Sequence, residues 1–443
     1  MEVTTMFSIH RPPGPARVAG AAAAAAATLA LTACGSSGGD DGTLTILVDN
    51  TEATVDSVQA LADAYTAANP DTEIDLELRP GGSEGDNIVK TRLQTGDMPD
   101  LFFYNSGSLL QALAPEQNLV DLSGEPFMDA VAETFQEGVR SDDRVFGVPV
   151  GNAVGGGVLY NLPAYEDLGL EVPRTWDEFT ANNQAILDAG DAAPVIQTYG
   201  PDSTWTSQLF VLADNYNVLA AEPDFAERYT ANEAHYADTP AAMAGFEHLQ
   251  EVNEAGFLNE DFASASYADG LAALASGEGV HYPMLTNAIT ELRATDPDAL
   301  DDIGFFALPG EDPDDVGVTT WLPGALYLPQ TTDDQAAAED FLAFAASVEG
   351  CDAQTEAVGV TGPYFIDGCT IPEDVPPGVA QLQEYFDAGL TAPALEFLSP
   401  VKGPALEQIT VEVGSGIRSA EDAAALYDED VKKQAQQLGL EGW

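Results

Sequence analysis

Basic residues are rare in this sequence. Its 443 residues include 14 lysines and arginines against 74 aspartates and glutamates, so the formal net charge is −60 at pH 7. Such a field repels phosphate backbones and anionic lipid headgroups, which excludes nucleic acid as a partner. The acidity does not by itself indicate a cation site, because a solvated acidic surface is the simpler explanation.

Long hydrophobic runs are also missing beyond the first 33 residues. The apolar, alanine-rich segment 18–33 follows Arg11 and Arg17, which is the layout of an export signal. Its sixteen residues would form roughly 24 Å of helix, short of the ~30 Å core of a bilayer. We therefore predict a signal peptide over residues 1–33 and no membrane-spanning helix.

The leader ends in Leu31-Thr32-Ala33-Cys34 and is followed by the run GSSGGDDG. Small residues before a cysteine resemble the lipobox of bacterial lipoproteins, and this resemblance implies that Cys34 is the lipidated residue. Residues 34–42 would then be a flexible linker and the lipid the sole membrane attachment. A plain secretory signal with an incidental cysteine is the alternative.

Cysteine and histidine are too scarce for metal or nucleophile chemistry. Besides Cys34 there are two cysteines, Cys351 and Cys369, and beyond residue 33 there are three histidines, none in a His-x-x-x-His or Cys-x-x-Cys pattern. We predict no metal, no cofactor and no catalytic cysteine. In an exported protein the cysteine pair predicts a disulfide, which closes a loop worth about 3 kcal/mol; two free thiols are the alternative.

The ordered part of the chain begins as an alternation of strands and helices. Apolar runs at 43–48, 74–78 and 100–104 predict strands, and amphipathic segments between them predict helices. This order indicates a parallel sheet flanked by helices, whose ligands lie beyond the carboxyl ends of the strands. Residues 49–52 and 104–107 should therefore lie at one rim.

Glycine and proline punctuate two later segments, 146–161 and 317–329. Each fits a crossing between two lobes, because hinges absorb changes in φ and ψ; for the first, a glycine-rich turn within one domain is the alternative. The Gly155-Gly156-Gly157 run lacks the context of a phosphate loop. Thr175 and Glu178 form a predicted capping box. Further strands are predicted at 279–285 and 302–309, and helices at 241–255, 267–275 and 335–350.

Five segments together resemble the extracellular solute-binding proteins of carbohydrate uptake, the family that includes maltose-binding protein. The most specific is residues 148–179, where a hinge, a Tyr-Asn pair and the helix start PRTWDEF follow one another; the others are 64–76, 93–104, 273–285 and 336–347. The resemblance implies a two-lobe, periplasmic-binding-protein-like (type II) α/β fold, with parallel-rich sheets flanked by helices and a multi-strand hinge. We expect lobe 1 to hold residues 43–150 plus about 320–365, and lobe 2 to hold 151–319 plus about 366–443.

The resemblance also implies ligand-binding residues. A sugar offers apolar C–H faces and a rim of hydroxyls, so its site needs aromatic platforms together with amides and carboxylates. Several positions have a structural alternative: helix capping for Asp49 and Asn50, a turn role for Asn152, and lobe packing for Trp205. The predicted ligand-binding residues are Asp49, Asn50, Glu52, Tyr104, Asn105, Asn152, Trp205, Tyr282, Asn287 and Trp321.

Some positions depart from the family pattern or are expected to be structural. The segment near Asn287 lacks the tryptophan of many members, so stacking is assigned to Tyr282 or Trp321. Trp176 should belong to the core, and Lys402 should form a structural ion pair rather than bind a ligand.

The expected function is capture of a sugar or oligosaccharide by lobe closure and its delivery to the permease of an ABC importer. The protein would be a monomer, without enzymatic activity, anchored by lipid at the extracellular face of the cell membrane in a Gram-positive bacterium. A receptor for a polyamine or another cationic solute is the first alternative. A secreted glycosidase, with two carboxylates about 5 to 10 Å apart, and a surface adhesin are the others.

Overall fold

The computed structural model describes residues 43–201, 203–440 and 442–443. The predicted signal peptide, linker and lipidated Cys34 lie outside the described residues. Within the described part, no helix has both the length and the apolar character needed to cross a bilayer.

The first sheet has the strand order β2-β1-β3-β12-β6. Strands β1 (Thr43–Asp49), β2 (Glu73–Arg79) and β3 (Leu101–Tyr104) are parallel, and they are connected by helices α1 (Glu52–Ala68) and α2 (Gly82–Thr95). The predicted strand and helix order is therefore confirmed in this region. Two further strands, β12 (Ala325–Tyr327) and β6 (Gly147–Pro149), extend the sheet by antiparallel pairing.

The second sheet has the order β13-β11-β7-β9-β8, with β10 also paired to β7. It is mixed, because β7 pairs antiparallel with β9, β10 and β11, while β8 with β9 and β11 with β13 are parallel. The strands predicted at 279–285 and 302–309 are present. The bounds are β7 (Val154–Asn161), β8 (Ala193–Val195), β9 (Gly279–Leu285), β10 (Ile303–Ala307), β11 (Val318–Trp321) and β13 (Thr391–Pro393).

The glycines that open β7 allow close packing in this sheet. A Cβ atom at Gly156 would lie 2.4 Å from Cζ3 of Trp321, and one at Gly157 would lie 2.4 Å from the carbonyl oxygen of Phe306. Neither separation is possible for real atoms, so larger residues would push β11 or β10 away. The glycine run therefore has a packing role.

Most of the helices follow the sequence prediction, and one differs. Thr175 and Glu178 form both bonds of the predicted capping box at the start of α7 (Trp176–Ala189). Helices α11 (Pro240–Glu254) and α12 (Tyr267–Ser276) are also present. The single helix predicted over 335–350 is instead two, α14 (Gln335–Ala345) and α15 (Val348–Val358). The break occurs because Ser347 is extended and its hydroxyl accepts a bond from Gly350 N, which starts a new helix.

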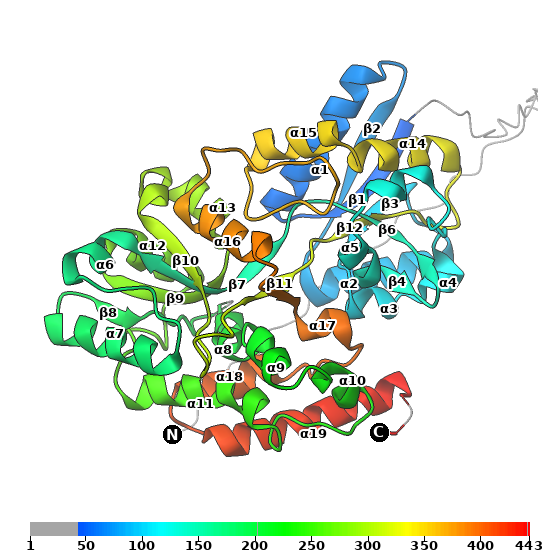
Figure 1. The fold of residues 1–443 in the computed structure, drawn as a ribbon. Coiled ribbons are helices and arrows are strands. Elements are labelled where there is room, and N and C mark those ends of the chain that lie inside the picture. The colour runs from blue at the N-terminus through cyan, green and yellow to red at the C-terminus, as the bar shows by residue number, and fades with distance from the viewer. Residues whose placement is uncertain (1–42, 202, 441) are drawn as a thin grey trace, which may run out of the picture. The chain divides into compact units, whose positions relative to one another are not determined.

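The remaining helices are shorter or lie toward the C-terminus. In Figure 1, α1, α14 and α15 pack beside one another, and the C-terminal helix α19 packs against α11. The predicted disulfide between Cys351 in α15 and Cys369 is formed, with Cα atoms 6.1 Å apart. The other helices are α3 (Ser108–Gln111), α4 (Pro115–Asn118), α5 (Glu133–Gly138), α6 (Leu162–Leu168), α8 (Leu209–Leu212), α9 (Asn215–Ala221), α10 (Phe225–Thr230), α13 (Ala288–Thr295), α16 (Pro377–Asp387), α17 (Leu395–Leu398), α18 (Leu406–Gly414) and α19 (Ala420–Leu438).

Each sheet has its own hydrophobic core. One core is built from residues between 44 and 153, between 322 and 346, and Phe365. The cores around the second sheet use residues between 158 and 318, Val360, and residues between 379 and 435. The chain passes from the first sheet to the second between β6 and β7 and returns between β11 and β12, in the two segments where crossings were predicted. The residue boundaries of the lobes stay a prediction.

Candidate ligand-binding site

The two sheets face each other along the edges that the crossings connect. At the first edge, Asp49 at the end of β1 pairs with Arg79, and Tyr104 at the end of β3 pairs with Ala325. At the second edge, Val154 at the start of β7 pairs with Trp321 at the end of β11. Residues 150–153 and 322–324 connect these edges, and linkers this short keep them close. The carboxyl ends of β1, β2, β3 and β11 therefore border one site.

The loop after β1 contributes two free polar side chains. Asp49 Oδ1 accepts a bond from Thr51 N at 3.0 Å, so this carboxylate shapes the turn into α1. Asn50 N donates to the carbonyl oxygen of Arg79 at 2.9 Å, which holds the loop against the end of β2. The side chains of Asn50 and Glu52 are exposed and form no hydrogen bond with other described residues. They are the residues of this loop that remain available to a ligand.

Beside this loop, Tyr104 is part of the support rather than of the surface. Its ring is 0 % exposed and lies under the guanidinium of Arg79, whose Cζ is 5.6 Å from the ring centroid. Burial raises the pKa of the Tyr104 hydroxyl, and the nearby carboxylate of Asp86 raises it further. The predicted contact by this ring is therefore not available in this conformation. Asn105, the next residue, is exposed.

Arg79 was missed in the sequence prediction. It is only 5 % exposed, and its Nη1 and Nη2 donate to the carbonyl oxygens of Pro80 at 3.1 Å and Phe103 at 3.2 Å. A buried guanidinium in so acidic a chain holds the ends of β2 and β3 together. The available signal was a single arginine closing an otherwise alternating strand, IDLELR.

The first crossing is fixed by Asn152. Its Oδ1 accepts bonds from both the backbone nitrogen of Thr361 at 2.9 Å and the Thr361 hydroxyl at 2.5 Å, and the residue is 8 % exposed. Ala153 N donates to the carbonyl oxygen of Pro363 at 2.7 Å. The Asn152 side chain thus ties the crossing to the segment after α15, and its oxygen is already used.

At the second edge, Trp321 is held by a carboxylate. The ring is half-buried against Gly156, and its Nε1 donates to Glu396 Oε1 at 2.6 Å. The other oxygen of Glu396 lies 3.5 Å from the ammonium of Lys402, which confirms the ion pair expected for Lys402. Glu396 lies in α17 and was not predicted, because it is one of 74 acidic residues without any distinguishing spacing.

The remaining predicted residues differ in their exposure. Trp205 is half-buried, with its ring centroid 5.4 Å from that of Tyr267. Tyr282 is 0 % exposed, and its hydroxyl lies 2.8 Å from Thr198 Oγ1, so the ring supports Tyr267 and Thr198 from within the core. Asn287 is exposed at the start of α13 and forms no side-chain capping bond there. Of these residues, Trp205 and Asn287 have accessible side-chain surface.

A cavity of about 470 Å³ lies where residues of the first core meet α17 and α19. Its walls include Gly107 and Arg140 on one side and Glu396 and Phe397 on the other. Gly107 has φ of +71°, and a Cβ there would lie 2.7 Å from Cδ1 of Phe397. Only glycine both adopts this backbone and allows Phe397 so close.

The described residues contain no group of three or more histidine, cysteine, aspartate or glutamate residues placed to hold a metal ion. The side chains that border the facing edges are instead an aromatic ring, amides and carboxylates. This set suits a ligand with many hydroxyl groups or a cationic ligand.

Comparison with known proteins identifies the family. The model of the family described as bacterial extracellular solute-binding protein matches residues 50–350. The multiple sugar-binding protein of Streptococcus mutans is 23% identical over 249 residues, which is 56% of this chain and 57% of that protein. The diacetylchitobiose binding protein DasA of Streptomyces coelicolor is 26% identical over 302 residues, covering 64% of this chain and 67% of that one. The chain thus spans little more than half the length of the first of these relatives.

A solved structure shows the same fold. The protein described as SBP RafE in complex with raffinose has a TM-score of 0.72 with this chain at 22% sequence identity, and the match covers 89% of this chain and 99% of that one. The two-lobe α/β fold expected from the resemblance is therefore present. On the family match over residues 50–350, the chain belongs to the bacterial extracellular solute-binding proteins, a family of binding proteins and not of enzymes.

Proposed function

We propose that this protein captures a sugar or oligosaccharide between the facing edges of its two sheets and delivers it to an ABC membrane importer. The relatives named for sugar binding, diacetylchitobiose binding and a complex with raffinose support a carbohydrate ligand. Family membership argues against the glycosidase alternative, because the function of the family is binding.

The observation that carries the proposal is the tethered ring of Trp321. A tryptophan whose Nε1 is bonded to a carboxylate keeps one orientation, so a sugar that stacks on it loses little further entropy. At the ends of β1 and β3, Asn50, Glu52 and Asn105 offer an amide, a carboxylate and a second amide on exposed side chains. Such groups bond the hydroxyl rim of a sugar whose apolar face rests on the indole.

The other predicted residues are divided among further contacts, residues that shape the loops, and buried supports. Trp205 and Asn287 have accessible side chains and are proposed as further contacts. Asp49 and Asn152 shape the two loops that present the contacts, through their bonds to Thr51 and Thr361. Tyr104 and Tyr282 are buried and support the neighbouring contact residues from within the cores.

The cellular setting rests on the sequence alone. We propose that Cys34 carries a lipid, that the following Gly/Ser/Asp segment is a tether, and that the monomeric protein is held at the extracellular face of a Gram-positive cell membrane. Tethering would keep the receptor at high effective concentration near its permease. Replacing Cys34 by Ala should release the protein from the membrane fraction, and retention of the variant there would contradict the anchor.

The sugar site is tested by calorimetry with the mature chain. A panel of raffinose, maltose, diacetylchitobiose and chitin oligosaccharides should contain at least one binder, and spermidine should give no heat that depends on Trp321. Trp321→Ala should weaken binding of that sugar at least about tenfold, whereas Trp321→Phe should keep part of the platform.

Trp443 provides the matched control. Its Nε1 donates to the carbonyl oxygen of Thr230, and it packs beside Tyr229, so Trp443→Phe should leave sugar affinity unchanged. Circular dichroism verifies that each variant is folded. Tight spermidine binding that is lost in Trp321→Ala, without a response to any sugar, would establish the cationic-solute alternative. Unchanged sugar affinity in Trp321→Ala would refute the role of this ring.

A further inference from the structure

A second cavity lies between α9, α11 and the loop that follows β10. Its volume is about 250 Å³. Four alanine side chains form its apolar wall, and its polar residues include Asp214, His248 and Glu311. The alanines are Ala220, Ala221, Ala241 and Ala244.

Asp214 brings a buried carboxyl group with one unused oxygen. The residue is 1 % exposed and immediately precedes α9. Its Oδ1 accepts a bond from Asn217 Nδ2 at 2.7 Å, and the same amide also donates to the carbonyl oxygen of Leu308 at 3.1 Å. Among the described residues, Oδ2 has no hydrogen-bond partner although its exposed area is below 1 Å². A buried polar atom without a partner is costly, which makes it a candidate for ligand binding.

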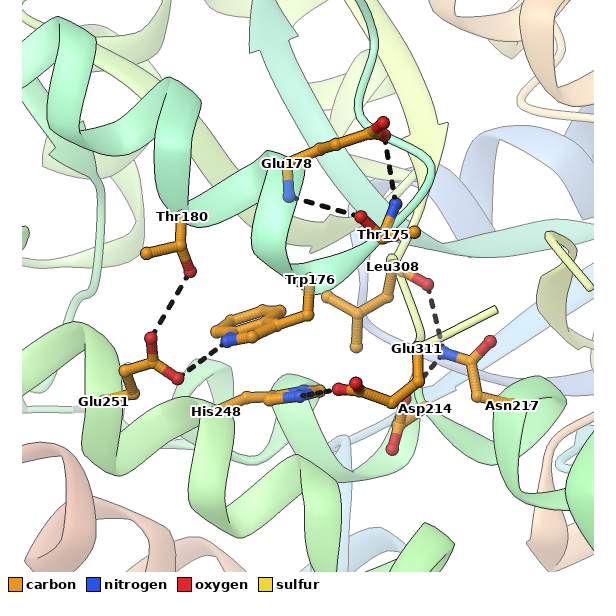
Figure 2. Close-up of polar contacts among 10 residues, drawn as sticks. All are labelled: Thr175, Trp176, Glu178, Thr180, Asp214, Asn217, His248, Glu251, Leu308 and Glu311. Atoms are coloured by element: carbon orange, nitrogen blue, oxygen red, sulfur yellow. Dashed lines mark hydrogen bonds and ion pairs between the residues drawn. The ribbon is translucent and has the colours of Figure 1, made fainter. Parts of the chain in front are cut away.

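His248 lines the same cavity with a second unused atom. Its ring is stacked on the indole of Trp176, with centroids 3.7 Å apart and planes 12° from parallel. Trp176 is itself fixed, because its Nε1 donates to Glu251 Oε2 at 2.8 Å. Figure 2 shows the imidazole beneath Trp176, with Glu311 and Asp214 at its side. Nδ1 of His248 has no partner among the described residues, and Nε2 lies 3.9 Å from Glu311 Oε1.

The charge around this cavity is one-sided. Besides Asp214 and Glu311, its lining includes Asp312 and Asp315 and no lysine or arginine. The guanidinium of Arg174 bonds to the carbonyl oxygen of Pro313 in the neighbouring loop. Burial lowers the pKa of His248 to about 3, so its ring is neutral and one nitrogen is an acceptor.

Asp214 lies in the same acidic and buried environment. Burial raises its pKa to about 8, and the nearby carboxylate of Glu311 adds to the rise. A bound cation would lower the pKa of Asp214, because it would supply the opposite charge that the cavity lacks.

We propose that this cavity binds a small primary alkylammonium ion. An ammonium group has three N–H donors and no acceptor, which matches Asp214 Oδ2, a nitrogen of His248 and the carboxylate of Glu311. The short alkyl chain lies against the alanine wall. This site is separate from the proposed sugar site, since it uses none of the same residues, and it does not depend on that proposal.

The test is calorimetry of the mature chain with propylammonium, at about 0.3 M salt to screen binding to the acidic surface. 1-Propanol, which has a similar alkyl chain without the charge, is the control ligand. Propylammonium should bind with a stoichiometry of one and 1-propanol should not. At pH 7 close to one proton should be released per bound cation, because Asp214 loses its proton when the cation binds. Repeating the titration in buffers of different ionisation enthalpy measures this release.

Three variants localise the binding. Asp214→Asn keeps an acceptor for Asn217 but removes the charge, and it should weaken propylammonium binding about tenfold or more and abolish the proton release. Ala244→Leu fills the cavity without changing a charge and should also remove binding. Asp298→Asn, an exposed acid that does not line the cavity, should bind as the parent does. Thermal unfolding shows whether each variant is folded.

The outcomes separate clearly. No saturable binding of propylammonium would overturn the proposal, as would equal binding of 1-propanol. Binding that survives in both Asp214→Asn and Ala244→Leu would place the ammonium elsewhere and overturn it as well. If Asp214→Asn fails to fold, Ala244→Leu alone decides, because its effect does not depend on the carboxylate.

Discussion

The disulfide between Cys351 and Cys369 should contribute strongly to stability, and its removal can be predicted in magnitude. The bond closes a loop with a sequence separation of 18. In the chain-entropy estimate, a loop of this length restricts the unfolded chain by about 3 kcal/mol. Replacing both cysteines by alanine should therefore lower the free energy of unfolding by about that amount. Cys351 is 2 % exposed, so the lost sulfur also leaves a small cavity worth roughly 1 kcal/mol.

The loop closed by this bond also holds the first crossing. Thr361 and Pro363 lie inside it, and they bond Asn152 and Ala153. Loss of the disulfide should therefore increase amide exchange in residues 150–153 more than in β1, whose bonds do not depend on the loop.

Denaturation in guanidinium is the assay. The oxidised parent, the parent under reductant, and the double alanine variant are compared, with the reduced parent as the control that retains both sulfurs. The reduced parent should lose about 3 kcal/mol and the variant slightly more. A loss below about 1 kcal/mol in both would refute the reasoning, since it would show that the loop does not restrict the unfolded chain.

Two other predictions concern stability. Thr175→Ala should cost about 1 kcal/mol in chemical denaturation because it removes the acceptor for Glu178 N in the capping box, whereas Thr175→Ser should be near the parent; equal loss in both would contradict a capping role. Burial lowers the pKa of His281 to about 3, against 6.5 ordinarily. The contribution of the neutral ring to the free energy of unfolding is therefore complete above pH 6.5 and is lost as pH falls toward 3. At pH 5 this one residue should cost about 2 kcal/mol, and His281→Gln should show a shallower fall in unfolding midpoint between pH 7.5 and 5. A slope identical to that of the parent would contradict this reasoning.

The order of the elements could be read from local pattern. The strands and helices from β1 to β3, the capping box at Thr175, and the strands β9 and β10 all follow from apolar rhythm and end signals. Trp176 is 5 % exposed, in agreement with its predicted place in the core. These features depend on neighbours within a few residues, which is why the sequence suffices for them.

The roles of the aromatic residues could not be read in the same way. Tyr104 ends the buried strand β3, and its ring lies on the same inward face as Phe102, two residues earlier, and is fully buried. Tyr282 is buried because Thr198 and Tyr267 cover it. Trp321 is oriented by Glu396, from a helix far along the chain. The alternation of side chains along a strand shows which residues share a face of the sheet. Whether that face is buried depends on the segments that pack against it.

The sequence by itself determined the class of fold, the family resemblance, the pairing of the two cysteines, and the scarcity of positive charge. Tertiary structure decided which polar and aromatic side chains are accessible at the facing edges, and it brought Asp214, His248 and Glu311 from separate stretches to one cavity. The reason is physical. Local propensity and periodicity act over a few residues, whereas burial, unpaired acceptors and shared cavities arise only when distant segments pack together.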